Sequence, residues 1–305
     1  MNQSPAGDTD ELPLVDDLLA KHFGPSPPPV RVEFGAASHT GLVRSNNEDH
    51  FVVVERRRTR AVLLTNLPDG FLPPADDTAY VLAVADGMGG AAFGELASSL
   101  ALRSGWEQAP AAIKWTWIVT DKEIEDLKER LELTFRRMDQ ALRDRAAADP
   151  ACAGMGTTLT GAYTVGPEAF VAHVGDSRAY LHRAGRLTQL TRDQTLAQQC
   201  RDMGMPVLKA SWHHVLTDCL GARDHDVHVE FHHLRLADGD RLLLCTDGLT
   251  DMVSDGDIAE VLGRDAHPRE AARALVDRAL ERGGLDNVTA VVARYELADP
   301  EPAGG

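Results

Sequence analysis

The chain has 305 residues, of which 43% are hydrophobic, so it can bury the core of one large domain or two small ones. Asp and Glu number 47 against 31 Lys and Arg, and the resulting net charge of −16 argues against a nucleic-acid partner, which would require a basic surface. No apolar stretch approaches the roughly 20 residues that cross a bilayer, no signal peptide is recognisable, and the four cysteines form no Cys-x-x-Cys pair. We therefore expect a cytoplasmic protein without membrane contact.

Proline marks the N-terminal boundary of the folded region. The segment GPSPPPV at 24–30 is stiff, and it predicts that residues 1–30 form a proline-rich tail set apart from the domain. The segment VDDLLAKHF at 15–23 has an amphipathic pattern, but a disordered or loosely docked arm is the simpler interpretation. We place one folded domain at 31–296 and a short C-terminal tail at 297–305.

After the tail, the pattern runs from strands to helices and back to strands. Two long helices are expected between the second and third strands, one from about Ala91 to Trp106 and one that opens at Thr120. Two later helices open at Ser254 and Pro268. The predicted strands, rich in β-branched and apolar residues, are EDHFVVVE, AYVLAVA, TLTGAYTV, AFVAHV, AYLHR, VHVEFHHL, DRLLLCT and VTAVVARY.

Short turns indicate how these strands pair. Gly166-Pro167 and Ala184-Gly185 each join two strands across a tight loop, which is typical of antiparallel hairpins and not of βαβ crossovers. Antiparallel sheets with segregated helices predict a layered α+β domain.

Four short acidic motifs follow or precede apolar runs. They read GLVRSNNED at 41–49, VADGMGG at 84–90, CTDGLTD at 245–251 and GGLDNVT at 283–289. Each sets a carboxylate beside glycine, asparagine or another acid, and several strand ends that deliver carboxylates to one place form a site for a hard cation. Oxygen ligands suit Mg²⁺, Mn²⁺ or Ca²⁺ rather than zinc.

With these motifs in this order, the chain resembles the metal-dependent protein serine/threonine phosphatases of type 2C, the PPM family, and its bacterial branch in particular. MGTTLTGAYTV, HVGDSRAYL, LTRDQT and DNVTAVV complete the resemblance, which covers about 35–295. It implies a four-layer α/β/β/α sandwich of two antiparallel sheets flanked by helices, with 31–296 as the catalytic domain.

The resemblance also implies roles for the acidic residues. Two Mn²⁺ or Mg²⁺ ions would share and activate a water that attacks phosphorus. Asp86 corresponds to the carboxylate that bridges the ions, and the Gly87 carbonyl would bind one of them. Asp247 and Asp286 correspond to further metal ligands.

A second group of residues is expected to support this centre. Arg44 corresponds to the arginine that binds two phosphate oxygens with its planar fork. Glu48, Asp49 and Asn287 are expected to lie around the metals and support their ligands, with Glu48 and Asp49 holding metal-bound waters. For Asp49 and Asn287 the alternative is that each only braces a loop. Asp176 in GDSR is expected to be mainly structural.

The chain departs from the family at several places. Met88 stands where many animal members have a histidine that protonates the leaving group, so the general acid is unassigned. Bacterial members carry a third-metal aspartate just before MGTT; here Asp149 is out of register, and a third metal is uncertain. The histidines at 213–214 and 225–233 could suggest zinc, but the latter alternate with apolar residues as in a strand.

Three segments have no assigned role. The insertion at 56–77 is interpreted as a solvated turn, the segment at 196–225 matches the variable flap of the family, and IKWTWIV at 113–119 is an extra apolar element.

The leading hypothesis is a monomeric phosphatase that acts on phosphoserine and phosphothreonine in phosphoproteins and reverses a bacterial Ser/Thr kinase. One alternative is a pseudophosphatase scaffold that binds phosphoproteins, which would be expected to lack one of Asp86, Asp247 and Asp286. Another is a partner-switching phosphatase of an anti-sigma-factor antagonist, which would be expected to carry a sensor domain. The sequence does not specify the substrate or the kinase.

Overall fold

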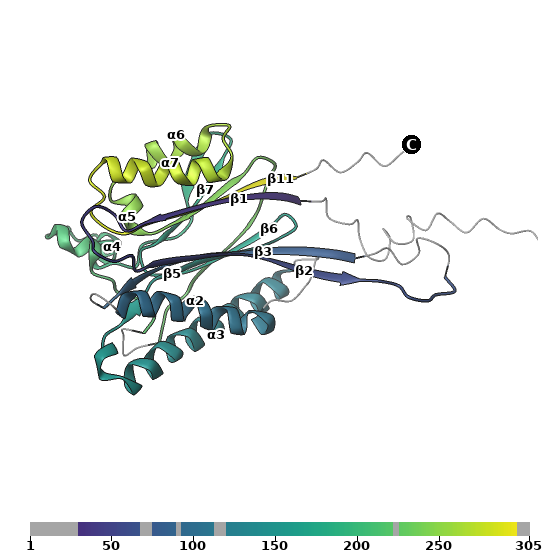
Figure 1. Cartoon of the computed structure of the whole chain (residues 1–305), viewed down its shortest axis with the longest axis horizontal. Helices are drawn as coiled ribbons and strands as arrows, with labels where there is room; N and C mark the ends of the chain where they lie inside the picture. Colours follow the sequence, from purple (N-terminus) through teal and green to yellow (C-terminus); the bar gives the residue numbers. More distant parts are fainter. Residues whose placement is uncertain (1–29, 68–74, 90–92, 113–119, 222–225, 298–305) are drawn as a thin grey trace, which may run out of the picture.

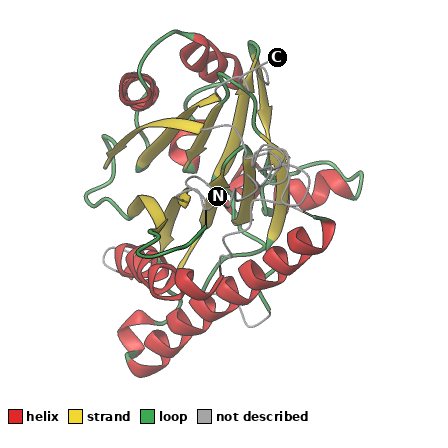
Figure 2. Ribbon diagram, turned by 90° about the vertical axis from the view of Figure 1, so that its right-hand side faces the viewer, coloured by secondary structure: helices red, strands yellow, loops and turns green. Residues whose placement is uncertain are grey.

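The computed structural model describes residues 30–67, 75–89, 93–112, 120–221 and 226–297. In these residues two antiparallel sheets pack face to face, and helices cover both outer faces (Figure 1). Figure 2, turned by 90°, shows the same separation of yellow strands in the middle from red helices outside. The predicted α+β sandwich is confirmed. The predicted tails at 1–30 and 297–305 and the segment at 113–119 lie almost entirely outside the described residues.

The strands form two sheets with all pairs antiparallel. The first sheet has the order β1-β11-β10-β7-β8, and the second has the order β2-β3-β5-β6-β9, with the short β4 paired to β3. The strands of the first sheet are β1 (Val30–His39), β11 (Val288–Leu297), β10 (Arg241–Cys245), β7 (Arg178–Arg183) and β8 (Arg186–Gln189). Those of the second are β2 (Asp49–Arg60), β3 (Ala75–Met88), β4 (Gly156–Thr157), β5 (Leu159–Val165), β6 (Glu168–Val174) and β9 (Glu230–Arg235).

Helices lie on the outer face of each sheet. Figure 1 shows α2 and α3 against the sheet that contains β3, and α6 and α7 against the sheet that contains β1. Their bounds are α2 (Phe93–Ala112), α3 (Asp121–Ala148), α4 (Leu196–Asp202), α5 (Asp247–Thr250), α6 (Asp255–Gly263) and α7 (Pro268–Glu281), with 3₁₀ turns η1 (Pro150–Cys152) and η2 (Ala210–His214). None of the described helices is long and apolar enough to span a membrane.

The sequence predicted the starts of helices α3 and α6 correctly, but it did not predict the end of α2. Thr120 and Glu123 form the predicted capping box of α3, and Ser254 accepts a hydrogen bond from the Asp257 backbone at the start of α6. Helix α2 continues to Ala112, so the predicted end near Trp106 was wrong. The continuation includes Pro110, a residue that usually ends or kinks a helix, among three alanines, which are strong helix formers.

Strands in the middle of the sandwich are buried on both faces because side chains alternate along a strand. Leu82 and Val84 of β3 belong to the core between the sheets, whereas Ala83 and Ala85 pack under α2 and α3. In β10, Leu244 faces the core between the sheets, while neighbouring residues of the strand pack against α6 and α7. This arrangement explains why both segments read as continuous apolar runs.

Two hairpins match the prediction and one segment does not. Ala184 has a φ of 49° and Gly166 a φ of 52°, as the tight turns between β7 and β8 and between β5 and β6 require. The insertion at 56–77 was expected to be a solvated turn, but Arg56 pairs with Ala79 and Arg60 with Ala75. Its flanks therefore lengthen the β2–β3 hairpin, because a residue of an edge strand such as Arg57 can keep its side chain in water while its backbone is paired.

Antiparallel pairing brings the acidic motifs to one edge of the sandwich. Asp49 opens β2 and lies opposite Asp86 near the end of β3. Asp247 follows the end of β10, and Asp286 precedes the start of β11. Since adjacent antiparallel strands run in opposite directions, one strand's end lies beside the next strand's start. These positions therefore meet at one edge of the sandwich, where Figure 1 shows α5, the helix that begins at Asp247.

Truncation of the core between the sheets is expected to be costly. Leu244→Ala, at a fully buried position, should lower the free energy of unfolding by about 2–5 kcal/mol, because both the transfer energy and a cavity contribute. Leu133→Ala, on the exposed side of α3, should change it by less than about 0.5 kcal/mol. Urea unfolding of both variants tests this expectation, and similar losses in the two would contradict it.

Candidate metal centre and phosphate site

A pocket of about 1170 Å³ opens at the edge of the sandwich where the acidic motifs meet. Three of its walls come from separate parts of the chain: the loop between β1 and β2, the ends of β3 and β10, and the segment around η2. Its charged lining residues are Arg44, Glu48, Asp86, Asp176, Asp247, Asp251 and Asp286, with His213 and His214 on the η2 side. The structure therefore brings Arg44, Glu48, Asp86, Gly87, Asp247, Asp286 and Asn287 together, as the sequence predicted.

Asp86 is held in place through its backbone. Its N–H donates to the Thr158 hydroxyl at 3.0 Å, and its carbonyl accepts from the Thr157 hydroxyl at 2.8 Å and from the Thr158 N–H at 2.9 Å. The two threonines of the MGTT motif thus position this aspartate. The Asp86 carboxylate remains free of these contacts and faces the pocket.

Asp49 lies beneath Asp86 and is almost fully buried. Its Oδ2 accepts hydrogen bonds from the hydroxyls of Thr246 and Thr289, both at 2.8 Å. Its Oδ1 is buried and has no hydrogen-bond partner among the described residues, and the same is true of Asp247 Oδ1. Buried carboxylate oxygens normally find a partner, so two such atoms at one pocket fit a site for a cation.

Burial, and then crowding by other carboxylates, raises the pKa values of three aspartates at this site. Burial, followed by the charges of Asp49, Asp247 and Asp176, raises the pKa of Asp86 well above its usual range. Burial raises the pKa of Asp49 to about 7, although the two threonine hydroxyls oppose this. The pKa of Asp176 is also raised, by burial and then by Asp247. Divalent cations bound by these oxygens would remove the repulsion, so the donor set fits hard ions of the Mn²⁺ or Mg²⁺ type.

Gly87 is placed where a side chain could not fit. A Cβ at this position would collide with the carbonyl of Gly94 at the start of α2. The Gly87 carbonyl and the Glu48 carboxylate both lie against Gly94. Burial raises the pKa of Glu48, which the charge of Arg44 lowers in turn. This close approach is consistent with a main-chain metal ligand at Gly87 and with Glu48 beside it.

Arg44 and Asp286 form an ion pair across the mouth of the pocket. Arg44 Nη2 lies 2.6 Å from Asp286 Oδ2, and the other carboxylate oxygen accepts from the Asn287 N–H at 2.8 Å. The Arg44 side chain is 56% exposed, so the rest of its guanidinium faces solvent and the pocket. The contact with Asp286 raises the pKa of Arg44, and the group stays charged.

Asn287 lies behind the centre and braces the loop between β1 and β2. Its Nδ2 donates to the carbonyls of Thr40 at 2.8 Å and Asn46 at 2.7 Å, and its Oδ1 accepts from the Glu48 N–H at 2.8 Å. The sequence left two roles open for Asn287, and these contacts fit the second, in which it braces a loop.

Three residues of the pocket were missed or undervalued in the sequence. Asp176, expected to be mainly structural, lines the pocket. Asp251 lies four residues after Asp247, and burial and the Asp247 charge raise its pKa to about 6. His214 Nδ1 lies 3.6 Å from Asp251 and 3.9 Å from Asp247. The carboxylates of Asp247 and Asp251 raise the pKa of His214 to about 9. The four-residue spacing in CTDGLTD could have revealed Asp251; nothing local revealed His214.

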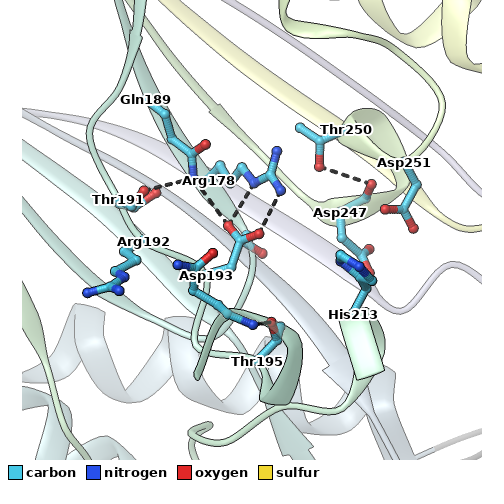
Figure 3. A network of polar contacts seen from close by, with 12 residues as sticks. Arg178, Gln189, Thr191, Arg192, Asp193, Thr195, His213, Asp247, Thr250 and Asp251 are labelled. Carbon is cyan, nitrogen blue, oxygen red and sulfur yellow. Dashed lines mark hydrogen bonds and ion pairs between the residues drawn. The ribbon is translucent and has the colours of Figure 1, made fainter. Parts of the chain in front are cut away.

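The GDSR and LTRDQT motifs support the floor of the pocket (Figure 3). Arg178 forms a two-point ion pair with Asp193, with contacts of 2.7 and 2.6 Å, and Gln189 donates to Asp193 at 3.2 Å. Figure 3 places this pair beside Asp247 and Asp251 without joining them. Arg178 thus fastens the loop after β8 to the start of β7, next to Asp176.

The other metal hypotheses find less support. Asp149 caps η1, with its Oδ1 accepting from the Ala151 N–H at 3.1 Å, and it pairs with Arg145 at 3.2 Å. It therefore points to its own helix end, as the out-of-register position predicted. His232 pairs with Glu230 at 2.7 Å and His233 with Glu168 at 2.8 Å on the sheet, so they do not converge with His214; position 225 lies outside the described residues.

Comparison with known proteins identifies the family. Residues 69–282 match the family described as Protein phosphatase 2C. The chain belongs to this family. The serine/threonine protein phosphatase PstP of Mycobacterium tuberculosis is 35% identical over 89% of the chain, and the serine/threonine phosphatase stp of Listeria monocytogenes is 30% identical over 84%. The chain spans about half, 47%, of the mycobacterial relative and 93% of the listerial one.

Solved structures agree with the sandwich of this 2C-family chain. A crystal structure of the mycobacterial PstP is 33% identical, with a TM-score of 0.66, and covers 87% of the chain and 99% of its own length. A second structure, of the PstP catalytic domain in complex with two manganese ions, is 32% identical, with a TM-score of 0.66, and covers 88% of this chain and all of its own.

Repulsion among the carboxylates predicts how metal-free protein responds to pH. A carboxyl whose folded pKa is raised stabilises the fold in its protonated form, and this contribution is lost as the pH rises from its unfolded value of 3.8 to about 7 for Asp49. Between pH 5 and 8 in EDTA, wild type should lose on the order of 2 kcal/mol more unfolding free energy than Asp49→Asn.

Urea unfolding at both pH values measures this difference, and the other titrating groups are common to the two proteins. Added Mn²⁺ should stabilise wild type more at pH 8 than at pH 5, because ionised carboxylates bind it better. Equal pH dependence of wild type and Asp49→Asn would contradict the assignment of a strained carboxyl at this position.

Proposed function

We propose that this chain is a metal-dependent protein serine/threonine phosphatase that hydrolyses phosphoserine and phosphothreonine in proteins. The observation that carries the proposal is the meeting of Asp86, Asp247 and Asp286, from three separate strand ends, in one pocket whose mouth holds Arg44. The printed names of the mycobacterial and listerial relatives support it. The proposal covers this chain alone, since the first of these relatives is about twice as long.

The metals proposed are two Mn²⁺ or Mg²⁺ ions, in line with the two manganese ions of the PstP complex. Asp86, the Gly87 carbonyl, Asp247 and Asp286 would hold them. When bound, such ions would polarise a water and the phosphate and offset the negative charge of the reaction. Glu48 and Asp49 would accept hydrogen bonds from waters around the ions.

The chain's own residues supply positioning. Thr157 and Thr158 fix the backbone of Asp86, and Asn287 fixes the loop that carries Arg44. Arg44 can bind two phosphate oxygens and so orient the phosphorus toward the carboxylate-lined floor. Its ion pair with Asp286 places this guanidinium directly beside a proposed metal ligand.

The two alternatives have weaker support. A scaffold without catalysis has no need of three convergent aspartates, or of the unpaired buried oxygens on Asp49 and Asp247. Nothing in the described residues favours partner switching. Cytoplasmic location, a monomeric state and a bacterial Ser/Thr kinase as the opposing enzyme stay predictions. The four cysteines are buried and form no disulfide with one another, which is compatible with a reducing compartment.

Hydrolysis of phosphopeptides tests the proposal. Phosphoserine and phosphothreonine peptides should be hydrolysed with Mn²⁺ or Mg²⁺, phosphotyrosine peptides should be poor substrates, and EDTA should abolish turnover. Asp86→Asn should reduce kcat by orders of magnitude with an unchanged circular-dichroism spectrum, while Asp277→Asn, on the exposed side of α7, should retain it. Full activity in chelated enzyme, or in Asp86→Asn at saturating Mn²⁺, would show that the centre is wrongly assigned.

Arg44→Ala should affect the substrate more than the metals. A charge-assisted contact is worth about 1.5–3 kcal/mol, so kcat/KM should fall roughly tenfold to a hundredfold, mainly through KM. Metal affinity should not weaken, because the substitution removes the guanidinium that competes with a metal ion for the Asp286 carboxylate. Steady-state kinetics and Mn²⁺ calorimetry measure the two effects.

Arg44→Lys should recover part of the loss, since a point charge cannot reproduce the fork. Arg103→Ala, which removes an exposed arginine paired with Glu107 on α2, is the matched control and should behave as wild type. Unchanged kinetics in Arg44→Ala would show that this arginine only braces its loop.

A further inference from the structure

Three large apolar side chains stand exposed beside the phosphate site. Leu42 is 65% exposed, Val43 is 66% exposed and Leu285 is 57% exposed. Val43 directly precedes Arg44, and Leu285 directly precedes Asp286 and itself lines the pocket. We refer to Leu42, Val43 and Leu285 as the apolar rim.

The apolar rim is one surface built from two distant segments. The Leu42 N–H donates to the Gly284 carbonyl at 2.7 Å, and a Cβ on Gly284 would lie 3.1 Å from Leu42 Cγ. The Leu42 side chain therefore packs over Gly284, next to Leu285. Single exposed leucines are common on protein surfaces, whereas several together at the mouth of a site mark a contact surface.

The loop that presents the rim is held firmly. Gly41 has a φ of 82°, and a Cβ there would collide with the Asp286 carbonyl, so only glycine allows this approach. Asn287 fastens the same loop at Thr40 and Asn46. Leu42 and Val43 are thus kept in solvent by the backbone and cannot turn inward, which lowers the entropy that binding a partner would cost.

We infer that the apolar rim is a substrate subsite for an apolar side chain one or two residues from the phosphorylated serine or threonine. This inference rests on the proposed function. When a phosphate is held at Arg44, the neighbours of the phosphorylated residue lie about 3.3 Å further away per residue of an extended peptide. Val43 and Leu285 directly precede the two members of the Arg44–Asp286 ion pair. Because Leu285 belongs both to the apolar rim and to the pocket lining, the occupant we infer for the rim is the substrate peptide itself.

The negative charge of the pocket also favours substrates with apolar rather than acidic neighbours. The lining includes Glu48, Asp176 and Asp251 in addition to the proposed metal ligands, and the chain as a whole carries a net charge of −16. An acidic residue next to the phosphorylated residue would meet like charge and would lose water without gaining a partner. The favoured substrates are therefore phosphopeptides with leucine, isoleucine, valine, methionine or phenylalanine beside the phosphorylated residue, and acidic neighbours are disfavoured.

Matched phosphothreonine peptides test the subsite. Three peptides of equal length carry leucine, serine or aspartate at the two positions on each side of the phosphothreonine. Wild type with Mn²⁺ should hydrolyse the leucine peptide with kcat/KM about tenfold above the serine peptide, mainly through KM, and should be slowest on the aspartate peptide.

Leu42→Ser and Leu285→Ser should each reduce the preference for leucine over serine to about threefold or less, whereas Leu42→Met should preserve it. Leu133→Ser, an exposed apolar position on α3, is the control and should keep the tenfold preference. Two separate variants guard against loss of folding in one of them, which thermal unfolding monitors.

The possible results distinguish failure of the rim subsite from failure of the proposed phosphatase activity. Hydrolysis of all three peptides at equal kcat/KM, or an unaltered preference in both serine variants, overturns the rim subsite and leaves the phosphatase proposal standing. Hydrolysis of none of them by wild type overturns the phosphatase proposal and the subsite with it. A concentration-dependent dimer in sedimentation that Leu42→Ser abolishes would assign the rim to a second copy of the chain and also overturn the subsite.

Discussion

Mutual repulsion of carboxylates in a confined pocket is the constraint on which this structure depends. Asp49 and Asp86 face each other across paired strands. Burial raises the pKa values of Asp86, Asp176 and Asp251, and the charge of Asp247 raises all three further. In a low-dielectric interior such a group of anions is unstable without protons or cations. The fold tolerates it because the surrounding backbone is fastened independently of the charges.

That fastening explains several motifs that are not themselves charged. The hydroxyls of Thr157 at the end of β4 and of Thr158, which follows it, hold the Asp86 backbone. Those of Thr246 and Thr289 bind one oxygen of Asp49, while the other is left unpaired. The Arg178–Asp193 pair fastens the loop beneath Asp176. Each support comes from an element other than the one it steadies, so the pocket keeps its shape while its carboxylates remain available for ligands.

The loop between β1 and β2 joins the metal-binding side of the pocket to its outer surface. It carries Arg44 on the pocket side and Leu42 and Val43 on the solvent side, and Asn287 and the Gly284 carbonyl hold it from the opposite segment. Phosphate binding and recognition of neighbouring residues would therefore share one rigid support, in keeping with the preorganisation expected of a site that positions a flexible peptide.

Much of this was determined by the sequence alone. The alternating and helical patterns predicted the strands and helices, the turns at Gly166 and Ala184 predicted antiparallel pairing, and the acidic motifs predicted Asp86, Asp247 and Asp286 as one group. These signals are local: a capping box, a tight turn or a carboxylate at a strand end acts through neighbours in the chain.

Only the tertiary structure decided the rest, because it depends on contacts between segments far apart in the chain. The pairing of Arg44 with Asp286, the approach of His214 to Asp251 and the packing of Leu42 over Gly284 join residues that no periodicity links. The place of Asp176 in the pocket, and the continuation of β2 through the basic run at 56–60, likewise depend on which strand lies opposite and on what remains open to water. A sequence states which side chains are present, but the dielectric and the neighbours that set their chemistry exist only once the sheets have packed.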